Sequence, residues 1–372
     1  MNIRLPFYLR LVAILLGVVL IVTIMREAKS ILVPLLVSGL LAVLISPFTS
    51  LLEKIKFPKA LAVGVSVISL VAVLSALLYF FYNQILGFSG DLGLLERRVG
   101  YYLGQLNVYI QENLDGVVPI STEDIQKSIF QYLYENATSL TQGVIATAGT
   151  LTMVFIMPIY IFLFLYFRSF LIEFILMSFD DKYRVKVQKV IHKVKLVVQN
   201  YISGMFWVIC ILAVLNSIAL ISLGIGHAFL FAGFAAILNV IPFLGPFLGA
   251  IFPILYAFLT KDSLWYPFGV FLAFYVIQLF ESNLFTPKIV GGKVSMNPLM
   301  TILALFVGNF IWGLAGMILF IPGMAILKVI FDEVEGMEAY GFLLGDARES
   351  MKRTERTSLK EQITKVRGRI KI

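Results

Sequence analysis

Long apolar stretches separated by short polar ones dominate the chain, and most are longer than the core helices of a soluble protein. They run over residues 11–25, 31–52, 60–82, 144–167, 201–223, 229–259, 264–280 and 298–330. A helix of about 20 apolar residues crosses a bilayer, and the ten-residue alternation of a membrane β-barrel is not seen. We therefore predict an all-α polytopic membrane protein with about 6–8 membrane segments.

Composition supports this class of protein. The 372 residues are 59% hydrophobic and 14% charged, with a mean hydropathy of +0.92, which leaves too little polar surface to coat a soluble globule. The first stretch follows Arg4 and Arg10 but has no small-residue cleavage site after Val22, so we predict a retained first helix. The lone Cys210 allows no disulfide within the chain.

The distribution of charge predicts the orientation in the membrane. Residues 83–143 carry more acids than bases, whereas residues 168–199 and the tail after Ile330 are rich in lysine and arginine. Basic loops stay in the cytoplasm, so we expect both termini inside and residues 83–143 outside. The net charge of +8 then reflects orientation, and no nucleic-acid partner is predicted.

The pattern divides the chain into six consecutive segments. These are N-terminal membrane helices (1–82), a small helical extracytoplasmic domain (83–143), a membrane helix (144–167), a basic amphipathic cytoplasmic helix (168–200), a transport core (201–330) and a basic cytoplasmic tail (331–372). The basic helix has an apolar stripe opposite its lysines, which suits the anionic lipid of the inner leaflet.

The outer domain begins with a heptad stripe that runs from Leu92 to Tyr109. Apolar residues three and four positions apart predict a helix that packs on another helix. The partner is either a second helix of the same domain, capped by Ser121 or Thr122, or another subunit.

Proline and glycine interrupt the apolar stretch 229–259. Pro242, Gly245 and Pro246 are expected to break the helix, and Gly249 and Pro253 follow within the same stretch. Proline removes a backbone donor and clashes with the preceding turn. Lipid cannot satisfy the freed backbone groups, so such a break persists only where protein covers it or water reaches it.

A second interruption divides residues 298–330 around Asn309 and Gly313, and Ile321-Pro322-Gly323 is expected to end that segment. Paired interruptions indicate a transporter's binding region. The half-segment 229–239 has a length of roughly 17 Å as helix, about half the hydrocarbon thickness. Either both segments are re-entrant hairpins and the loop 282–297 lies inside, or both cross fully and it lies outside; Lys288 and Lys293 favour hairpins.

The helix between the interruptions ends in Gln278, Glu281 and Asn283, and Gln278 and Glu281 share one face. A carboxylate at membrane depth is costly and marks an ion or proton path; the alternative is an interfacial glutamate in water. Asn216, Asn239 and Asn309 are intramembrane amides that either bond neighbouring helices or contact a ligand. No cofactor is predicted.

Several chemistries are missing from the sequence. Gly291-Gly292-Lys293-Val294-Ser295 lacks the spacing of a phosphate-binding loop, so no ATP site is expected. His192 and His227 are predicted on opposite sides of the membrane, which disfavours a metal site built on them. No nucleophile and base can be paired, so we predict that the chain is not an enzyme.

Taken together, four motifs resemble the autoinducer-2 exporter family of bacterial permeases. They are residues 239–253, residues 278–292 with Glu281 and Pro287, Asn297-Pro298-Leu299, and Gly313-Leu314-Ala315-Gly316. The resemblance implies an inner-membrane transporter that is driven by an ion gradient rather than ATP, and a homo-oligomer. Members are associated with export of the quorum-sensing signal autoinducer-2 or with sodium or proton exchange. The doubled glycine Gly291-Gly292 departs from the family's pattern.

The resemblance carries particular residues over. Pro242, Gly245, Pro246, Gly249 and Pro253 match the family's broken segment, while Glu281, Asn283 and Pro287 match its acidic motif. The leading hypothesis is a secondary transporter that exports a small polar solute, with autoinducer-2 as a candidate and H⁺ or Na⁺ as the coupling ion through Glu281. The alternatives are a sodium or potassium/proton antiporter and a non-transporting membrane scaffold.

Overall fold

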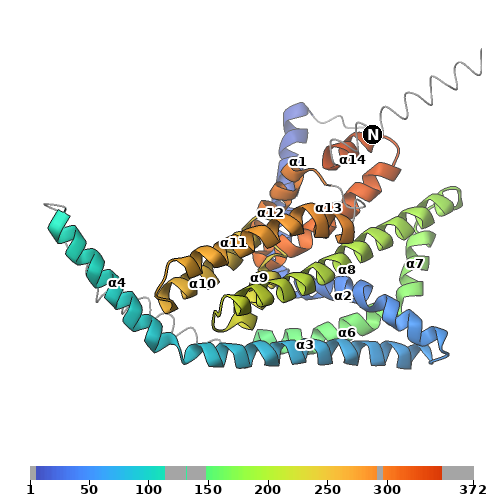
Figure 1. Ribbon diagram of the computed structural model, residues 1–372. Helices are drawn as coiled ribbons and strands as arrows, with labels where there is room; N and C mark the ends of the chain where they lie inside the picture. The colour runs from blue at the N-terminus through green and yellow to red at the C-terminus, as the bar shows by residue number, and fades with distance from the viewer. Residues whose placement is uncertain (1–5, 114–130, 132–147, 291–295, 346–372) are drawn as a thin grey trace, which may run out of the picture. The chain divides into compact units, whose positions relative to one another are not determined.

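A computed structural model describes residues 6–113, 131, 148–290 and 296–345 (Figure 1). All named elements within these ranges are helices. The predicted all-α polytopic architecture is confirmed: in the described part of the chain six helices are long and apolar enough to cross a membrane, and a seventh candidate is a bent pair with a 63° angle between residues 155–166 and 168–177.

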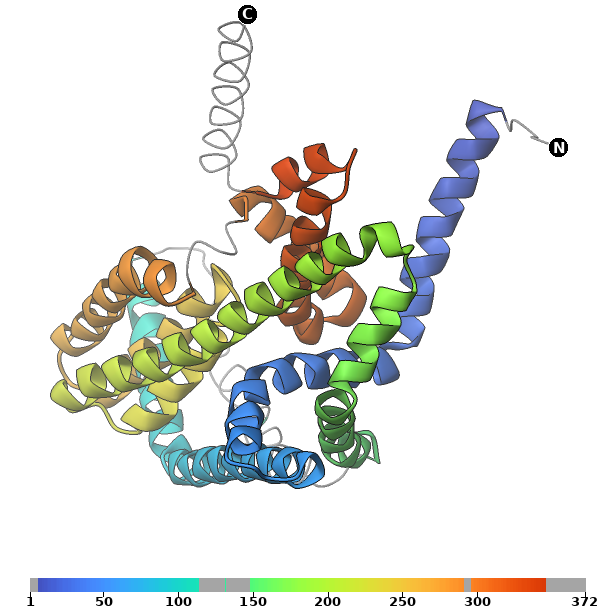
Figure 2. The ribbon, with the colours of Figure 1, turned by 90° about the vertical axis from the view of Figure 1, so that its right-hand side faces the viewer.

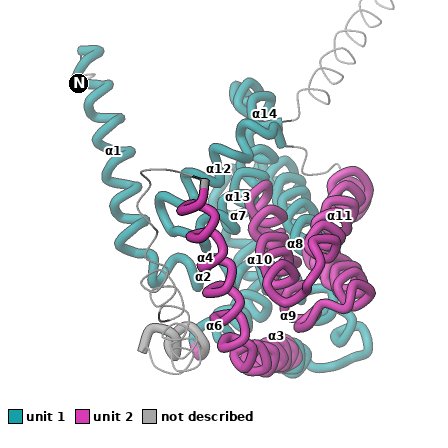
Figure 3. Tube along the Cα trace, turned by 60° about the vertical axis from the view of Figure 1, so that its left-hand side comes forward, with its two compact units in different colours: residues 1–67, 156–204, 290–372 teal, residues 68–155, 205–289 magenta. Residues whose placement is uncertain are grey.

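Contacts between residues divide the chain into two compact units, each assembled from non-consecutive segments (Figure 3). Unit 1 comprises residues 1–67, 156–204 and 290–372, and unit 2 comprises residues 68–155 and 205–289. The boundaries fall inside four helices, α3 (Lys59–Ser89), α6 (Ala148–Tyr166), α8 (Arg184–Ser222) and, at its last residue, the π-helix η2 (Glu281–Val290). The six consecutive segments read from the sequence remain predictions.

Unit 1 is built around a pair of helices that fold back on each other, α12 (Pro298–Trp312) and α13 (Leu314–Glu333). Its other elements are α1 (Phe7–Glu27), α2 (Lys29–Lys54), α7 (Arg168–Met177), the short 3₁₀ helix η1 (Asp181–Tyr183) and α14 (Glu338–Leu344). Trp312 is buried in the small core of this pair and donates its indole N–H to the Met25 carbonyl at 2.7 Å. This bond fixes the end of α1 to the end of α12.

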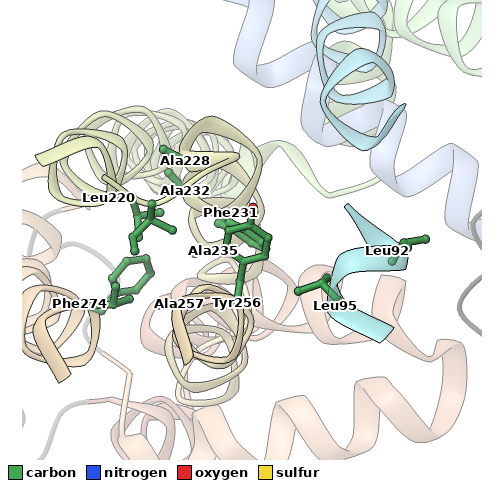
Figure 4. Close-up of a cluster of buried hydrophobic side chains, with 12 residues drawn as sticks. Leu92, Leu95, Leu220, Ala228, Phe231, Ala232, Ala235, Tyr256, Ala257 and Phe274 are labelled. Atoms are coloured by element: carbon green, nitrogen blue, oxygen red, sulfur yellow. The ribbon is translucent and has the colours of Figure 1, made fainter. Parts of the chain in front are cut away.

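Unit 2 holds a second pair of antiparallel helices, α9 (Ala228–Leu238) and α10 (Leu244–Thr260), together with α11 (Trp265–Phe280). Its remaining elements are α4 (Leu92–Asn113) and η2 (Glu281–Val290), a π-helix. The core gathers Phe231, Tyr256 and Phe274, and Leu92 and Leu95 enter it from α4 (Figure 4).

The first half of α4 has a packing partner that was not considered from the sequence. Leu92 and Leu95 are buried in the core of unit 2, and Tyr102 packs on Phe258 of α10 with ring centroids 5.0 Å apart. Tyr109, at the far end of the stripe, is exposed. The first half of the predicted stripe therefore contacts the α9–α10 hairpin; the predicted second helix near Ser121 and Thr122 lies outside the described residues.

The boundary predicted at residue 200 is not a helix end. After α7 and η1 the backbone enters α8, which runs without interruption from Arg184 to Ser222 (Figure 2). No proline or glycine pair stops the helix where the basic face gives way to the apolar one, so the change in composition at residue 200 is not a change in structure. One helix therefore carries both the basic face and the following span.

The predicted helix end at Ile321-Pro322-Gly323 is also wrong, because α13 continues through these residues to Glu333. Pro322 is fully buried, and protein surrounds the site where proline removes a backbone donor. Tertiary packing of this kind lets a transmembrane helix tolerate proline.

Candidate transport site

The first interruption is a tight turn between α9 and α10. The helices end at Leu238 and resume at Leu244, and the Ile241 N–H donates to the Leu238 carbonyl at 2.9 Å within the turn. Phe243 has a φ of 67°, a backbone conformation that is strained for a bulky side chain. Strain of this kind concentrates at functional sites.

The prolines and glycines of this segment have different roles from those expected. Pro242 lies in the turn, as predicted, but Gly245 and Pro246 lie in the first turn of α10 and do not break it. The first helical N–H groups have no intrahelical acceptor, so proline costs little at this position. Pro253 lies inside α10 and is fully buried.

Small residues allow α9 and α10 to pack backbone against backbone. A Cβ added at Gly245 would clash with the Leu238 carbonyl oxygen, and one added at Gly249 would lie 2.8 Å from Cα of Ala235. Real Cβ atoms do not approach so closely, so both positions require glycine for packing. Asn239 ends α9 with its side chain buried beside this contact.

The second interruption has the same construction. Gly313 joins α12 to α13 at a φ of 65°, and Gly308 faces Gly316 so closely that a Cβ on Gly308 would lie 2.5 Å from the Gly316 carbonyl oxygen. Asn297 begins α12 by accepting a hydrogen bond from the Leu299 N–H at 2.9 Å. Asn309 is exposed near the end of α12.

Glu281 is the most enclosed acidic residue among those of unit 2 that the structure describes. It is 8% exposed, and both carboxylate oxygens accept hydrogen bonds. Gln278 Nε2 donates to Oε2 at 2.8 Å, and Thr286 Oγ1 donates to Oε1 at 2.5 Å. A carboxylate held in this way can exchange a proton or a small cation while its neighbours stay in place.

The residue Thr286 was not found from the sequence, for a physical reason. It lies five positions after Glu281, and the two side chains meet because residues 281–290 form a π-helix. The α-helical spacing used for the prediction places i+3 and i+4 on one face and excludes i+5. Single π-helical turns are frequent at functional sites.

Asn283 does not join this cluster. Its side chain is exposed and donates to the Leu279 carbonyl at 2.9 Å. By contrast, Asn216 on α8 is 5% exposed, and its side-chain oxygen has no hydrogen-bond partner among the described residues. Leaving a buried acceptor unpaired costs about 1–3 kcal/mol.

The predicted site residues thus fall into two groups. Asn239, Pro242, Gly245, Gly249 and Glu281 belong to unit 2 with the other residues of the α9–α11 motifs, whereas Asn309 and Gly313 belong to unit 1. In each unit the two helices of a hairpin pack closely at glycine, at Gly249 in unit 2 and at Gly308 and Gly316 in unit 1.

Comparison with known proteins places these features in one family. The model of the AI-2E family transporters matches residues 9–336 of the chain. The protein named "Putative transport protein YrrI" of Bacillus subtilis is 34% identical over 131 residues, which cover 35% of this chain and 36% of YrrI.

Two further relatives match over most of their length. "Putative transport protein YueF" of Bacillus subtilis is 25% identical over 80% of this chain and 82% of its own. "AI-2 transport protein TqsA" of Escherichia coli is 24% identical over 90% of this chain and 95% of its own.

Proposed function

The chain belongs to the AI-2E family of transporters, and from this premise we propose that it exports a small polar solute across the bacterial inner membrane at the expense of an ion gradient. Proteins of this family are transporters, so the chain is a membrane permease and not an enzyme. The relative TqsA is named for AI-2, which makes autoinducer-2 the first solute to test.

The enclosure of Glu281 is the observation that carries this proposal. A carboxylate that is 8% exposed in an apolar chain is expensive, and Gln278 and Thr286 occupy its oxygens without neutralising it. A coupling group needs this combination, because it must bind an ion reversibly in one state and stay shielded in another. We propose H⁺ or Na⁺ as that ion.

The hairpins supply the second part of the proposal. With 11 residues α9 is about 16 Å long, and with 15 residues α12 is about 22 Å long, both shorter than the hydrocarbon core of about 30 Å. We propose that both hairpins are re-entrant, with their turns at membrane depth. The amides of Asn216 and Asn239 in unit 2 then provide polar contacts for the solute.

Transport by purified protein in lipid vesicles tests the proposal. The vesicles carry a pH gradient, and uptake of autoinducer-2 is compared between the wild-type chain, Glu281→Gln and Glu112→Gln. The Glu281→Gln substitution keeps the size of the side chain and one of its two acceptor oxygens but removes its ability to exchange a proton. Glu112 is an exposed acid on α4 and serves as the control.

We expect Glu281→Gln to abolish gradient-driven uptake and Glu112→Gln to leave it unchanged. Equal uptake by wild type and Glu281→Gln would remove this residue from the mechanism. Proton flux that depends on sodium or potassium, with no uptake of solute, would replace the export proposal with a cation/proton antiporter.

A further inference from the structure

A three-residue polar cluster lies at the end of the α9–α10 hairpin opposite its turn. Asp91 directly precedes α4, His227 directly precedes α9, and Tyr256 lies on α10 one turn before its end. The Tyr256 hydroxyl donates to Asp91 Oδ2 at 2.7 Å, and His227 Nε2 lies 3.0 Å from the same oxygen. One carboxylate oxygen therefore joins both hairpin helices to the corner between α3 and α4.

The surrounding residues hold this geometry. Phe88 at the end of α3 meets the His227 ring edge to face at 5.6 Å, and a Cβ added at Gly226 would lie 2.7 Å from the Tyr256 hydroxyl. His227 itself has a φ of 52°, in the left-handed region that histidine adopts more often than most non-glycine residues.

The three groups differ in how they take up protons. The hydrogen bond from Tyr256 is the largest of the effects that hold the pKa of the Asp91 carboxyl below its ordinary value of 3.8, with His227 adding to it, so Asp91 stays ionised near neutral pH. The carboxylate only accepts, so His227 Nε2 carries a hydrogen. With Nε2 holding its hydrogen, Nδ1 is the imidazole atom that can accept a further proton.

We propose that Asp91, His227 and Tyr256 form a proton-binding site that fastens the α9–α10 hairpin to the α3–α4 corner. A proton on His227 turns a neutral hydrogen bond into a charge-assisted one, so acid fastens the hairpin and alkali loosens it. The Asp91 side chain is 40% exposed, which gives water access to the site. Under the proposed function and orientation, that water is outside the cell.

Two of the neighbouring cationic side chains have contacts of their own away from Asp91 and His227. Ionisable groups on the adjoining parts of α3, α4 and α11 and on the α10–α11 loop include Tyr79, Tyr82, Glu96, Arg97, Arg98, Tyr101, Tyr102, Lys261, Asp262 and Tyr266. Arg98 pairs with Asp262 at 3.0 Å, and the Lys261 ammonium lies 5.0 Å from the centre of the Tyr266 ring. These contacts draw Arg98 and Lys261 toward partners of their own.

Hydrogen–deuterium exchange of the full chain in lipid nanodiscs tests the proposal without any need for a solute. The readout is exchange of the α9 amides at pH 8 and pH 5.5, corrected for the intrinsic dependence of exchange on pH. The variant is His227→Gln, which keeps a donor but does not titrate. The matched control is His192→Gln, since the chain has only these two histidines.

We expect α9 of the wild type and of His192→Gln to exchange about threefold more slowly at pH 5.5, because a charge-assisted bond at a partly exposed site is modestly stronger than a neutral one. His227→Gln should lose this difference. The same pH difference in His227→Gln would overturn the proposal.

A second variant and a second readout complete the test. His227→Asn, whose side chain tolerates a positive φ, repeats the experiment if His227→Gln does not fold. Solute uptake at varied outside pH then asks whether the site acts on transport: a wild-type profile in His227→Gln would overturn that role. If the export proposal is wrong, no solute is taken up at any pH. The hydrogen–deuterium exchange experiment still tests the proton-binding site, because it needs no solute.

Discussion

Individual glycines determine how closely the hairpin helices approach. Gly308 and Gly316 meet backbone to backbone in unit 1, and Gly249 meets Ala235 in unit 2. In hydrocarbon, helices associate through close packing of small residues, since lipid is as apolar as their side chains. A single methyl group at such a contact must therefore separate the helices.

Gly308→Ala is expected to lower the free energy of unfolding of the purified protein by about 1–3 kcal/mol, because the added methyl overpacks the α12–α13 contact. Its melting temperature should fall accordingly. Gly323→Ala on α13 is the control, since a Cβ there meets nothing within 4 Å. Thermal unfolding in nanodiscs, followed by intrinsic fluorescence, compares the two. Equal melting temperatures would show that the hairpin is loosely packed.

For individual residues, the sequence predicted where the helices are interrupted better than it predicted what each proline and glycine does there. Proline and glycine correctly located both interruptions, but Gly245 and Pro246 are needed for packing and for the first turn of α10. Gln278 and Glu281 were paired correctly from their spacing. Thr286 was missed because its contact depends on a local π-helix that spacing rules do not anticipate.

At the scale of elements, α4 packs into the core of unit 2 through the first half of its stripe. Leu95 is 7% exposed against the α9–α10 core, while its neighbour Leu94 is 50% exposed. Two adjacent leucines of equal size therefore have opposite environments, which makes them a matched pair for mutation. The sequence predicted the stripe but not its partner, because the α9–α10 hairpin lies more than 100 positions further along the chain.

Leu95→Ala should destabilise the docking of α4 by about 2–5 kcal/mol, as large-to-small substitutions in a core do. Leu94→Ala should cost almost nothing. Limited proteolysis between α3 and α4 measures the difference, with faster cleavage expected only in Leu95→Ala. Equal cleavage rates in both variants would show that α4 docks without its stripe.

Ion pairs connect α8 to the end of α13 within unit 1. Lys189 and Lys193 pair with Glu333, and Lys186 Nζ lies 2.8 Å from a Glu335 carboxylate oxygen. The hydrogen bond from Lys186 lowers the pKa of Glu335 from its ordinary value of 4.5. Folding is therefore favoured by this group above pH 4.5, and the contribution is lost as the pH falls through the lower folded pKa.

The segment that follows α13 should accordingly be protected equally at pH 8 and pH 5 and lose protection below about pH 4. Glu335→Gln should show part of that loss at neutral pH, and 1 M salt should weaken the wild-type contact at all pH values. Hydrogen–deuterium exchange over residues 334–345 measures both effects. Protection that is unaffected by salt would indicate that the contact is held by apolar packing.

For the whole molecule, the number and type of membrane helices followed from hydropathy, but the two units did not. Each unit combines segments that are far apart in the sequence, with boundaries inside α3, α6, α8 and η2. Composition changes along the sequence, such as the one at residue 200, report the passage from water to lipid. They carry no information about which helices pack together.

The orientation predicted from charge can be tested with single cysteines. In a Cys210→Ser background, Val108→Cys on α4 and Val185→Cys on α8 place a thiol at exposed positions. Positive-inside orientation predicts that a membrane-impermeant maleimide labels residue 108 in spheroplasts and labels residue 185 only after the membrane is permeabilised. The reverse pattern would place both termini outside and would move the proposed proton site to the cytoplasmic face.

Helix α1 has no buried residue, and the contacts that hold it to unit 1 gather at its end, where Met25 accepts the Trp312 bond and Arg26 lies over the Phe310 ring at 5.0 Å. Within one chain, its first four turns are therefore constrained by membrane insertion during biosynthesis and hardly at all by fit to other helices. Drift among leucine, isoleucine and valine should be nearly free there. Among homologous sequences, we expect the mean hydropathy of α1 to be preserved while the residues at its individual positions vary.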